Sequence, residues 1–193
     1  MNVLLCIGCN VYPVLGALYG AEKDATDVFN LLLREGEKYN RESSQLLLSP
    51  TDSEVRIALN TAFPNGKEIE VMTFFFAGHA GVKAGSFYLC SRDSSPDRFS
   101  TTAFPIIDLF TMVNEFHPKQ VNIVVDACES GGSSFDLNQL LKPEIVGSSE
   151  ATRITFLGAC SSNQLAGETQ NGGNLTRECF VETLVELTAS VKG

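Results

Sequence analysis

Residues 121–132 read Val-Asn-Ile-Val-Val-Asp-Ala-Cys-Glu-Ser-Gly-Gly, a β-branched run that ends in an acid, a cysteine and a Ser/Gly turn. A short apolar run of this kind is typical of a buried parallel strand. Cys128 then follows the carboxyl end of that strand, which is where open α/β sheets carry their ligands and their chemistry. The pattern therefore predicts a functional cysteine at one edge of a parallel sheet.

A second stretch has the same arrangement. Residues 71–76 are strongly apolar, and residues 77–81, Ala-Gly-His-Ala-Gly, follow them directly. If the two predicted strands are neighbours, His79 and Cys128 share one edge of one sheet. A thiol nucleophile and an imidazole base would then lie within reach of each other.

Composition and charge narrow the class of protein. The chain has 193 residues, of which 44% are hydrophobic and 19% are charged, so we expect one globular domain over residues 1–193. Its 14 basic and 23 acidic residues give a net charge of −9, which disfavours nucleic acid and anionic membranes as partners and suits a cationic substrate. The sequence shows no apolar run of roughly 20 residues and no signal peptide, so we expect a cytoplasmic protein.

Predicted strands and helices alternate along the sequence. Apolar runs predict strands at 3–9, 44–48, 71–76, 87–90 and 153–159 besides the strand before Cys128, and helical spacing predicts helices at 21–34, 54–63, 105–116 and 175–191. The polar segments at 91–102, 130–151 and 160–174 are predicted loops. The alternation predicts parallel βαβ units, and hence an α/β fold: a three-layer α/β/α sandwich with a mostly parallel central sheet.

We expect the cysteines to be reduced. Most of them lie in apolar runs, where a free cysteine behaves as a small hydrophobic residue, and the cytoplasm disfavours disulfides. Cys6 and Cys9 have the spacing of half a zinc site, but no second pair and no nearby histidine completes it, so we expect no metal. The six cysteines are Cys6, Cys9, Cys90, Cys128, Cys160 and Cys179.

His79 is the better placed of the two histidines to act as a base, because His117 follows a predicted helix and is expected to face solvent. Taken alone, His79 could be a locally bonded turn residue, and Cys128 a buried structural thiol. Together they indicate a site, because each ends a strong strand and precedes small, flexible residues. Asp24 lies in the first turn of the helix at 21–34, where a carboxylate commonly compensates the helix dipole on a solvated face.

Several stretches resemble the caspase-like cysteine peptidases (clan CD, family C14), most closely the metacaspases and the prokaryotic caspase-like proteases. Residues 76–80, Phe-Ala-Gly-His-Ala, resemble the family's histidine block, and residues 126–131, Asp-Ala-Cys-Glu-Ser-Gly, resemble the metacaspase cysteine block. His79 and Cys128 are 49 residues apart, close to the roughly 50 of caspases. Further similar stretches extend the resemblance over nearly the whole chain.

The resemblance implies a caspase-like fold and a Cys–His dyad in a cysteine endopeptidase. Cys128 would attack the peptide carbonyl, and His79 would protonate the leaving amine and later activate water. The backbone N–H groups of Ala80 and Cys128 would hold the developing oxyanion. The context implied by the family is regulated proteolysis, such as cell death, stress response or defence against phage.

The resemblance also implies a pocket for the residue before the scissile bond. Asp24 and Asp126 match the acidic positions of the metacaspase pocket, and Ala77 stands where metacaspases often have serine. Two carboxylates suit a guanidinium or an ammonium group. We therefore expect a protein or peptide substrate that is cleaved after Arg or Lys, and not after Asp.

Two further positions depart from the family's pattern. Ala80 replaces the usual glycine, which would be costly if the position required a positive φ. Glu129 replaces a histidine that is common there.

The family usually has one more strand after the final helix, so we expect the chain to be truncated or part of a larger protein. Because Lys142 is the only basic residue at 130–151 and Pro143 follows it, we expect activation by a ligand or partner protein rather than by self-cleavage.

Two alternatives stand beside the peptidase hypothesis. The chain could be a non-catalytic caspase-like domain that binds a basic peptide or scaffolds a complex, since a fold does not fix a function. It could also be an unrelated doubly wound signalling domain, although it has no GxGxxG motif and no P-loop lysine. Metacaspases often need calcium, but Asp93 and Asp97 are scattered loop acids and make a poor calcium site. We expect no resident cofactor, with calcium dependence left open.

Overall fold

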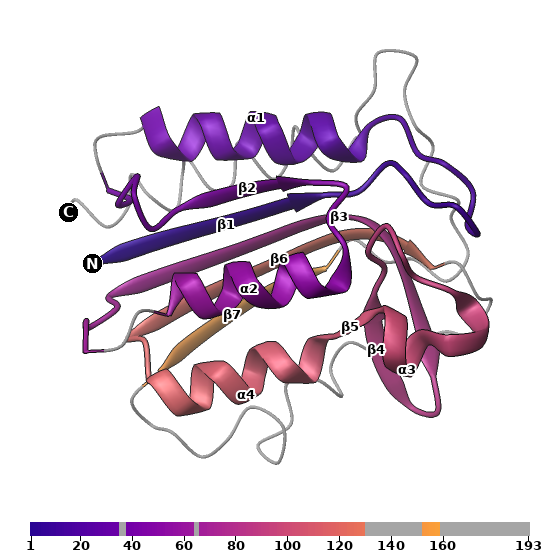
Figure 1. Ribbon diagram of the computed structural model, residues 1–193. Coiled ribbons are helices and arrows are strands. Elements are labelled where there is room, and N and C mark those ends of the chain that lie inside the picture. The colour runs from indigo at the N-terminus through magenta and orange to yellow at the C-terminus, as the bar shows by residue number, and fades with distance from the viewer. Residues whose placement is uncertain (35–37, 64–65, 130–151, 159–193) are drawn as a thin grey trace.

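The computed structural model describes residues 1–34, 38–63, 66–129 and 152–158, with the backbone alone for residues 128 and 129. Helices cover both faces of a central sheet (Figure 1). On one face lies α1 (Ala21–Arg34), and on the other lie α2 (Asp52–Ala62) and α4 (Ile106–Phe116). The predicted three-layer α/β architecture is confirmed.

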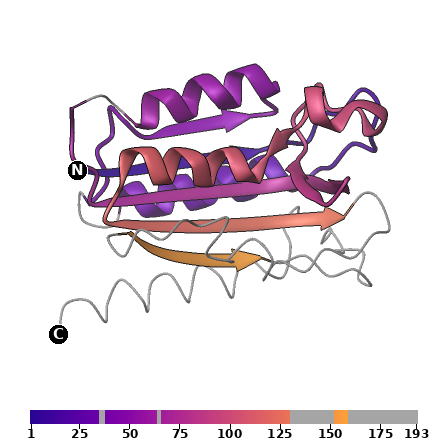
Figure 2. The same cartoon turned by 90° about the horizontal axis from the view of Figure 1, so that it is seen from below.

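The main part of the sheet is parallel, with strands in the order β2–β1–β3–β6–β7. Their bounds are Asn2–Gly8 for β1, Gln45–Leu48 for β2, Val71–Lys83 for β3, Gln120–Glu129 for β6 and Arg153–Gly158 for β7. Figure 2 shows β3, β6 and β7 side by side and running in one direction. The strands that carry His79 and Cys128 are therefore neighbours.

The carboxyl end of β3 continues into a small antiparallel extension. There β4 (Ser86–Leu89) pairs with the last residues of β3, and the short β5 (Phe104–Pro105) pairs with β4. The chain between β4 and β5 forms a 3₁₀ turn, η1 (Pro96–Arg98), and one helical turn, α3 (Phe99–Thr102). The segment predicted as a plain loop at 91–102 therefore contains two short helical turns.

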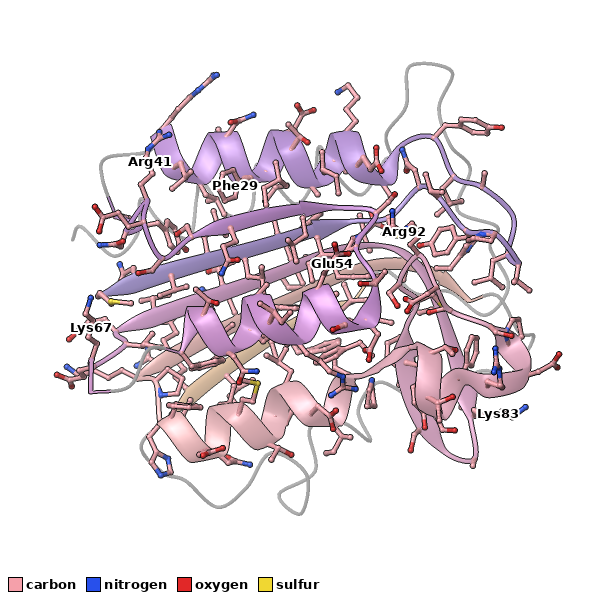
Figure 3. The ribbon with its side chains drawn as sticks, viewed as in Figure 1. Phe29, Arg41, Glu54, Lys67, Lys83 and Arg92 are labelled. Atoms are coloured by element: carbon pink, nitrogen blue, oxygen red, sulfur yellow. The ribbon has the colours of Figure 1, made fainter. Side chains whose placement is uncertain are left out.

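Alternate residues of each strand pack against opposite layers, as the pleat of a strand requires. Leu4 and Phe75 lie in the apolar cluster beneath α1, together with Val28 of that helix. Phe29 packs against the same cluster and points from α1 toward the sheet (Figure 3). Phe74 lies in the larger cluster beneath α2 and α4. Both faces of the parallel strands are thus apolar, which explains their near-continuous hydrophobic sequence.

Both central strands are longer than the sequence pattern predicts. Because β3 runs past His79 to Lys83, the prediction of a flexible turn at residues 77–81 is wrong. Strand β6 runs through Cys128 to Glu129, and the Ser/Gly turn predicted at 130–132 lies outside the described residues. Glycine usually weakens a strand, but Gly78 allows a close approach here. A Cβ atom on Gly78 would lie 2.6 Å from the hydroxyl of Tyr12.

Cys6, Cys9 and Cys90 are free thiols and are buried, as their apolar surroundings predict. The predicted loops at 130–151 and 160–174 and the predicted helix at 175–191 lie outside the described residues, as do Cys160 and Cys179. Within the part of the chain that the structure describes, no helix is both long enough and apolar enough to cross a membrane.

Candidate active site

The backbone places His79 and Cys128 directly opposite each other. They are register partners in the parallel pair formed by β3 and β6, two positions beyond the partners Ala77 and Asp126. Neighbouring strands lie about 4.8 Å apart, so the two residues occupy adjacent places at the carboxyl edge of the sheet. The side chain of Cys128 lies outside the described part of the structure.

The imidazole of His79 is held by a backbone carbonyl. Its Nε2 atom lies 2.7 Å from the carbonyl oxygen of Gly16. Because a carbonyl can only accept a hydrogen bond, Nε2 must carry the proton, and in a neutral ring Nδ1 is then the acceptor. Nδ1 is buried and has no hydrogen-bond partner among the described residues. The His79 ring therefore keeps a buried nitrogen that can accept a proton.

Tyr12 contacts both the backbone and the ring of His79. The backbone N–H of His79 donates to the hydroxyl of Tyr12 at 3.0 Å, and the two rings lie 4.8 Å apart with an interplanar angle of 49°. Tyr12 and Gly16 both belong to the loop between β1 and α1. Neither residue was expected at the site from the sequence. Tyr12 offered a signal, as an aromatic residue in a Pro/Gly-containing loop after a strand, whereas a carbonyl contact leaves no trace in a sequence.

The two predicted pocket carboxylates, Asp24 and Asp126, both lie on the α1 side of the sheet. Asp24 is 2% exposed and lies on the buried face of α1, so the interpretation that it faces solvent is wrong. Asp126 is 7% exposed. It follows Val124 by two residues, and Val124 packs beneath α1, so Asp126 faces that layer as well. Ala77, 2% exposed, belongs to the same cluster. A role for these residues in a substrate pocket stays a prediction.

Ala80, the predicted oxyanion residue, is fully buried within β3. It is the register partner of Leu89 in β4 and of Glu129 in β6. Ala80 is not one of the described residues with a positive φ, so alanine carries no backbone strain at this position. Whether its N–H holds an oxyanion is not tested by this geometry, and the assignment stays a prediction.

The loop acids considered for calcium have other surroundings. The Oδ1 atom of Asp93 accepts the backbone N–H of Asp52 at 2.9 Å and the hydroxyl of Ser91 at 3.0 Å, at the start of α2. Asp97 lies in η1 and is exposed. Across residues 1–34, 38–63, 66–129 and 152–158, no three His, Cys, Asp or Glu side chains gather as they would around a metal ion.

Comparison with known proteins adds evidence at the level of the fold. No protein-family model matches the chain, and no curated protein matches its sequence. Among solved structures, pro-sf-caspase-1 matches with a TM-score of 0.56 and 15% identity, over 95% of this chain and 69% of that one. The fold is caspase-like.

Two further structures are similar. Protein GSU0716 from Geobacter sulfurreducens matches with a TM-score of 0.53 and 19% identity, over 67% of this chain. The chain spans about half the length of that protein, 51%. The Drosophila initiator caspase Dronc matches with a TM-score of 0.49 and 16% identity, over 63% of this chain and 47% of Dronc. The match to pro-sf-caspase-1 confirms the resemblance for the fold, while a place among the metacaspases stays a prediction.

Proposed function

We propose that this chain is the peptidase domain of a cysteine endopeptidase that hydrolyses peptide bonds after Arg or Lys. The observation that carries the proposal is the pairing of His79 with Cys128 on adjacent strands of a caspase-like fold. The hydrogen bond to Gly16 supports it, because it leaves Nδ1 of the imidazole as the acceptor. A thiol reacts as the thiolate, so a proton acceptor beside it is what the chemistry requires.

The proposed reaction has two stages. Cys128 gives its proton to Nδ1 of His79, and its sulfur forms a bond to the substrate carbonyl carbon. The peptide C–N bond then breaks, and the imidazolium returns the proton to the departing amine. In the second stage His79 takes a proton from water, the water oxygen bonds to the acyl carbon, the C–S bond breaks, and the imidazolium returns the proton to the departing sulfur. Free acid and free thiol result.

Charge supports the proposed preference for a basic residue. Asp24 lies on the buried face of α1, and Asp126 is buried on β6, two residues after Val124, which packs beneath α1. A guanidinium or ammonium side chain of the substrate would be attracted by these two carboxylates, and an aspartate side chain would add a third negative charge.

The test is a comparison of kcat/KM for short reporter peptides that end in Arg, Lys or Asp before the reporter, using the full-length protein. We expect cleavage after Arg or Lys and none after Asp. Cys128→Ala should abolish turnover, and His79→Ala should lower kcat by about 10²-fold or more. Faster cleavage after Asp would contradict the pocket assignment. Binding of the Arg peptide without turnover would support a non-catalytic domain that binds basic peptides.

A further inference from the structure

We propose that Tyr12 is a positioning residue for His79: its hydroxyl fixes the loop that sets which imidazole nitrogen is basic. The role rests on the proposed peptidase function for its effect on rate, but its effect on the imidazole can be measured without any substrate. Three sets of contacts among the described residues support it.

The Tyr12 hydroxyl bridges two backbone segments beside the site. It accepts the N–H of His79 at 3.0 Å, so its own proton is available to the carbonyl of Cys90, 3.4 Å away. The N–H of Cys90 in turn donates to the carbonyl of His79 at 2.9 Å. Burial raises the pKa of the Tyr12 phenol well above its usual range, so the hydroxyl keeps the proton that this arrangement needs.

The loop that carries Tyr12 is closed and anchored at its base. The N–H of Leu18 donates to the carbonyl of Asn10 at 3.0 Å. The hydroxyl of Ser49 accepts the N–H groups of Asn10 and Val11, each at 3.1 Å. Between these anchors lie Tyr12, which binds the backbone of His79, and the Gly16 carbonyl, which binds its ring. Release of one contact therefore loosens the other.

The Tyr12 hydroxyl lies directly against β3 at Gly78. A Cβ atom on Gly78 would lie 2.6 Å from the Tyr12 oxygen, so only glycine leaves room for it. The Tyr12 ring also packs with Tyr88 and Phe99 in a separate apolar cluster. This packing does not need the hydroxyl, so Tyr12→Phe removes the bridge and keeps the filling of the cluster.

Nitrogen NMR of the imidazole rings shows directly whether Nδ1 or Nε2 of His79 carries the proton. The chain has two histidines, and His117, exposed at the end of α4, serves as an internal reference. At alkaline pH we expect the wild-type His79 spectrum to show the Nε2–H tautomer. Tyr12→Phe should shift His79 toward a mixture of tautomers, leave His117 unchanged and lower kcat about tenfold with little change in KM.

Tyr88→Phe is the matched control, because it removes a hydroxyl from the same cluster, where its ring stacks on Phe99 at 6.0 Å. It should leave the His79 spectrum as in wild type. Gly78→Ala would place a Cβ atom 2.6 Å from the Tyr12 hydroxyl and 2.9 Å from the Phe76 ring. It should reproduce the tautomer shift, and it covers the case in which Tyr12→Phe fails to fold. An unchanged tautomer and kcat in Tyr12→Phe, or the same shift in Tyr88→Phe, would overturn the proposal. A wild-type protein without turnover would overturn the peptidase function alone, and the tautomer shift would still decide the role of Tyr12.

Discussion

A histidine can accept a proton only at the nitrogen that does not already carry one, so the Gly16 carbonyl determines which nitrogen of His79 is the acceptor. It takes the Nε2–H of His79 and leaves a buried Nδ1 as the acceptor. Backbone carbonyls occur at every position of a chain, and this is why residue types alone could not identify Gly16. Residue types and their place after strong apolar runs did predict that His79 and Cys128 share one edge of the sheet, and their register confirms that placement.

The buried carboxylates make a testable prediction at the scale of single residues. Asp24→Asn removes a charge from the proposed pocket and should lower kcat/KM for an Arg substrate about tenfold to a hundredfold. A hydrogen bond to a charged group contributes about 1.5–3 kcal/mol, and each 1.4 kcal/mol is about tenfold in rate. Measurement of kcat/KM on Arg peptides checks this.

Asp27→Asn is the matched control for that experiment. Asp27 lies on the same helix, but its carboxylate pairs with Lys23 at 2.7 Å with 43% of the side chain exposed. The substitution makes the same change of charge and should alter kcat/KM by less than about twofold, since exposed ion pairs contribute little. Equal losses in the two variants would mean that overall charge, and not a pocket, sets the preference.

At the scale of elements, the first residue of α1 packs closely against the last residue of β1. A Cβ atom on Gly8 would lie 2.4 Å from the carbonyl oxygen of Ala21, the first residue of α1. Asp24 follows Ala21 by one helical turn. The approach of strand to helix at Gly8 therefore fixes the distance between β1 and the first turn of α1, which carries Asp24.

Gly8→Ala should push α1 away from β1 and destabilise the protein by about 1–3 kcal/mol, the usual cost of overpacking. Urea unfolding followed by circular dichroism measures the free energy of unfolding. Gly16→Ala is the comparison for stability, because a Cβ atom there would meet nothing within 4 Å. Similar stability in the wild type and Gly8→Ala would show that the contact is not tight in solution.

Element boundaries show where sequence patterns stop being informative. The cap of α2 was predictable because Thr51 and Glu54 form a capping box, in which each side chain accepts the other's backbone N–H. The continuation of β3 beyond Ala77 was not predictable, because glycines in a run usually signal a turn. Tertiary contacts decide otherwise here: β6 pairs with β3 past that point, and β4 folds back on its end.

At the scale of the whole molecule, the predicted site residues gather at one end of the sheet because its main strands are parallel. Figure 1 shows the β1–α1 loop, α3 and β4 at that end. Alternation of strand and helix patterns sufficed to predict this architecture. The strand at 87–90 was also predicted and corresponds to β4, but its antiparallel pairing with β3 and the short β5 were not, because tertiary contacts determine them. The substrate, the activating partner and the larger protein also stay predictions, because the fold alone fixes none of them.

The central claim is that His79 activates Cys128, and the pH dependence of cysteine alkylation tests it most directly. Iodoacetamide labelling of the full-length protein, mapped by mass spectrometry, follows every thiol at once. Burial raises the pKa of the Cys6 and Cys9 thiols, so both stay protonated and provide slow internal references at neutral pH. An unperturbed cysteine titrates near pH 8.5, and a thiol paired with an imidazole titrates lower.

We predict that Cys128 reacts at least about tenfold faster than Cys6 and Cys9 near pH 7, with a midpoint below about 7.5. His79→Ala should return that midpoint to near 8.5 and leave the labelling of Cys6 and Cys9 unchanged. Labelling of Cys128 with the same midpoint and rate in the wild type and in His79→Ala would contradict the account.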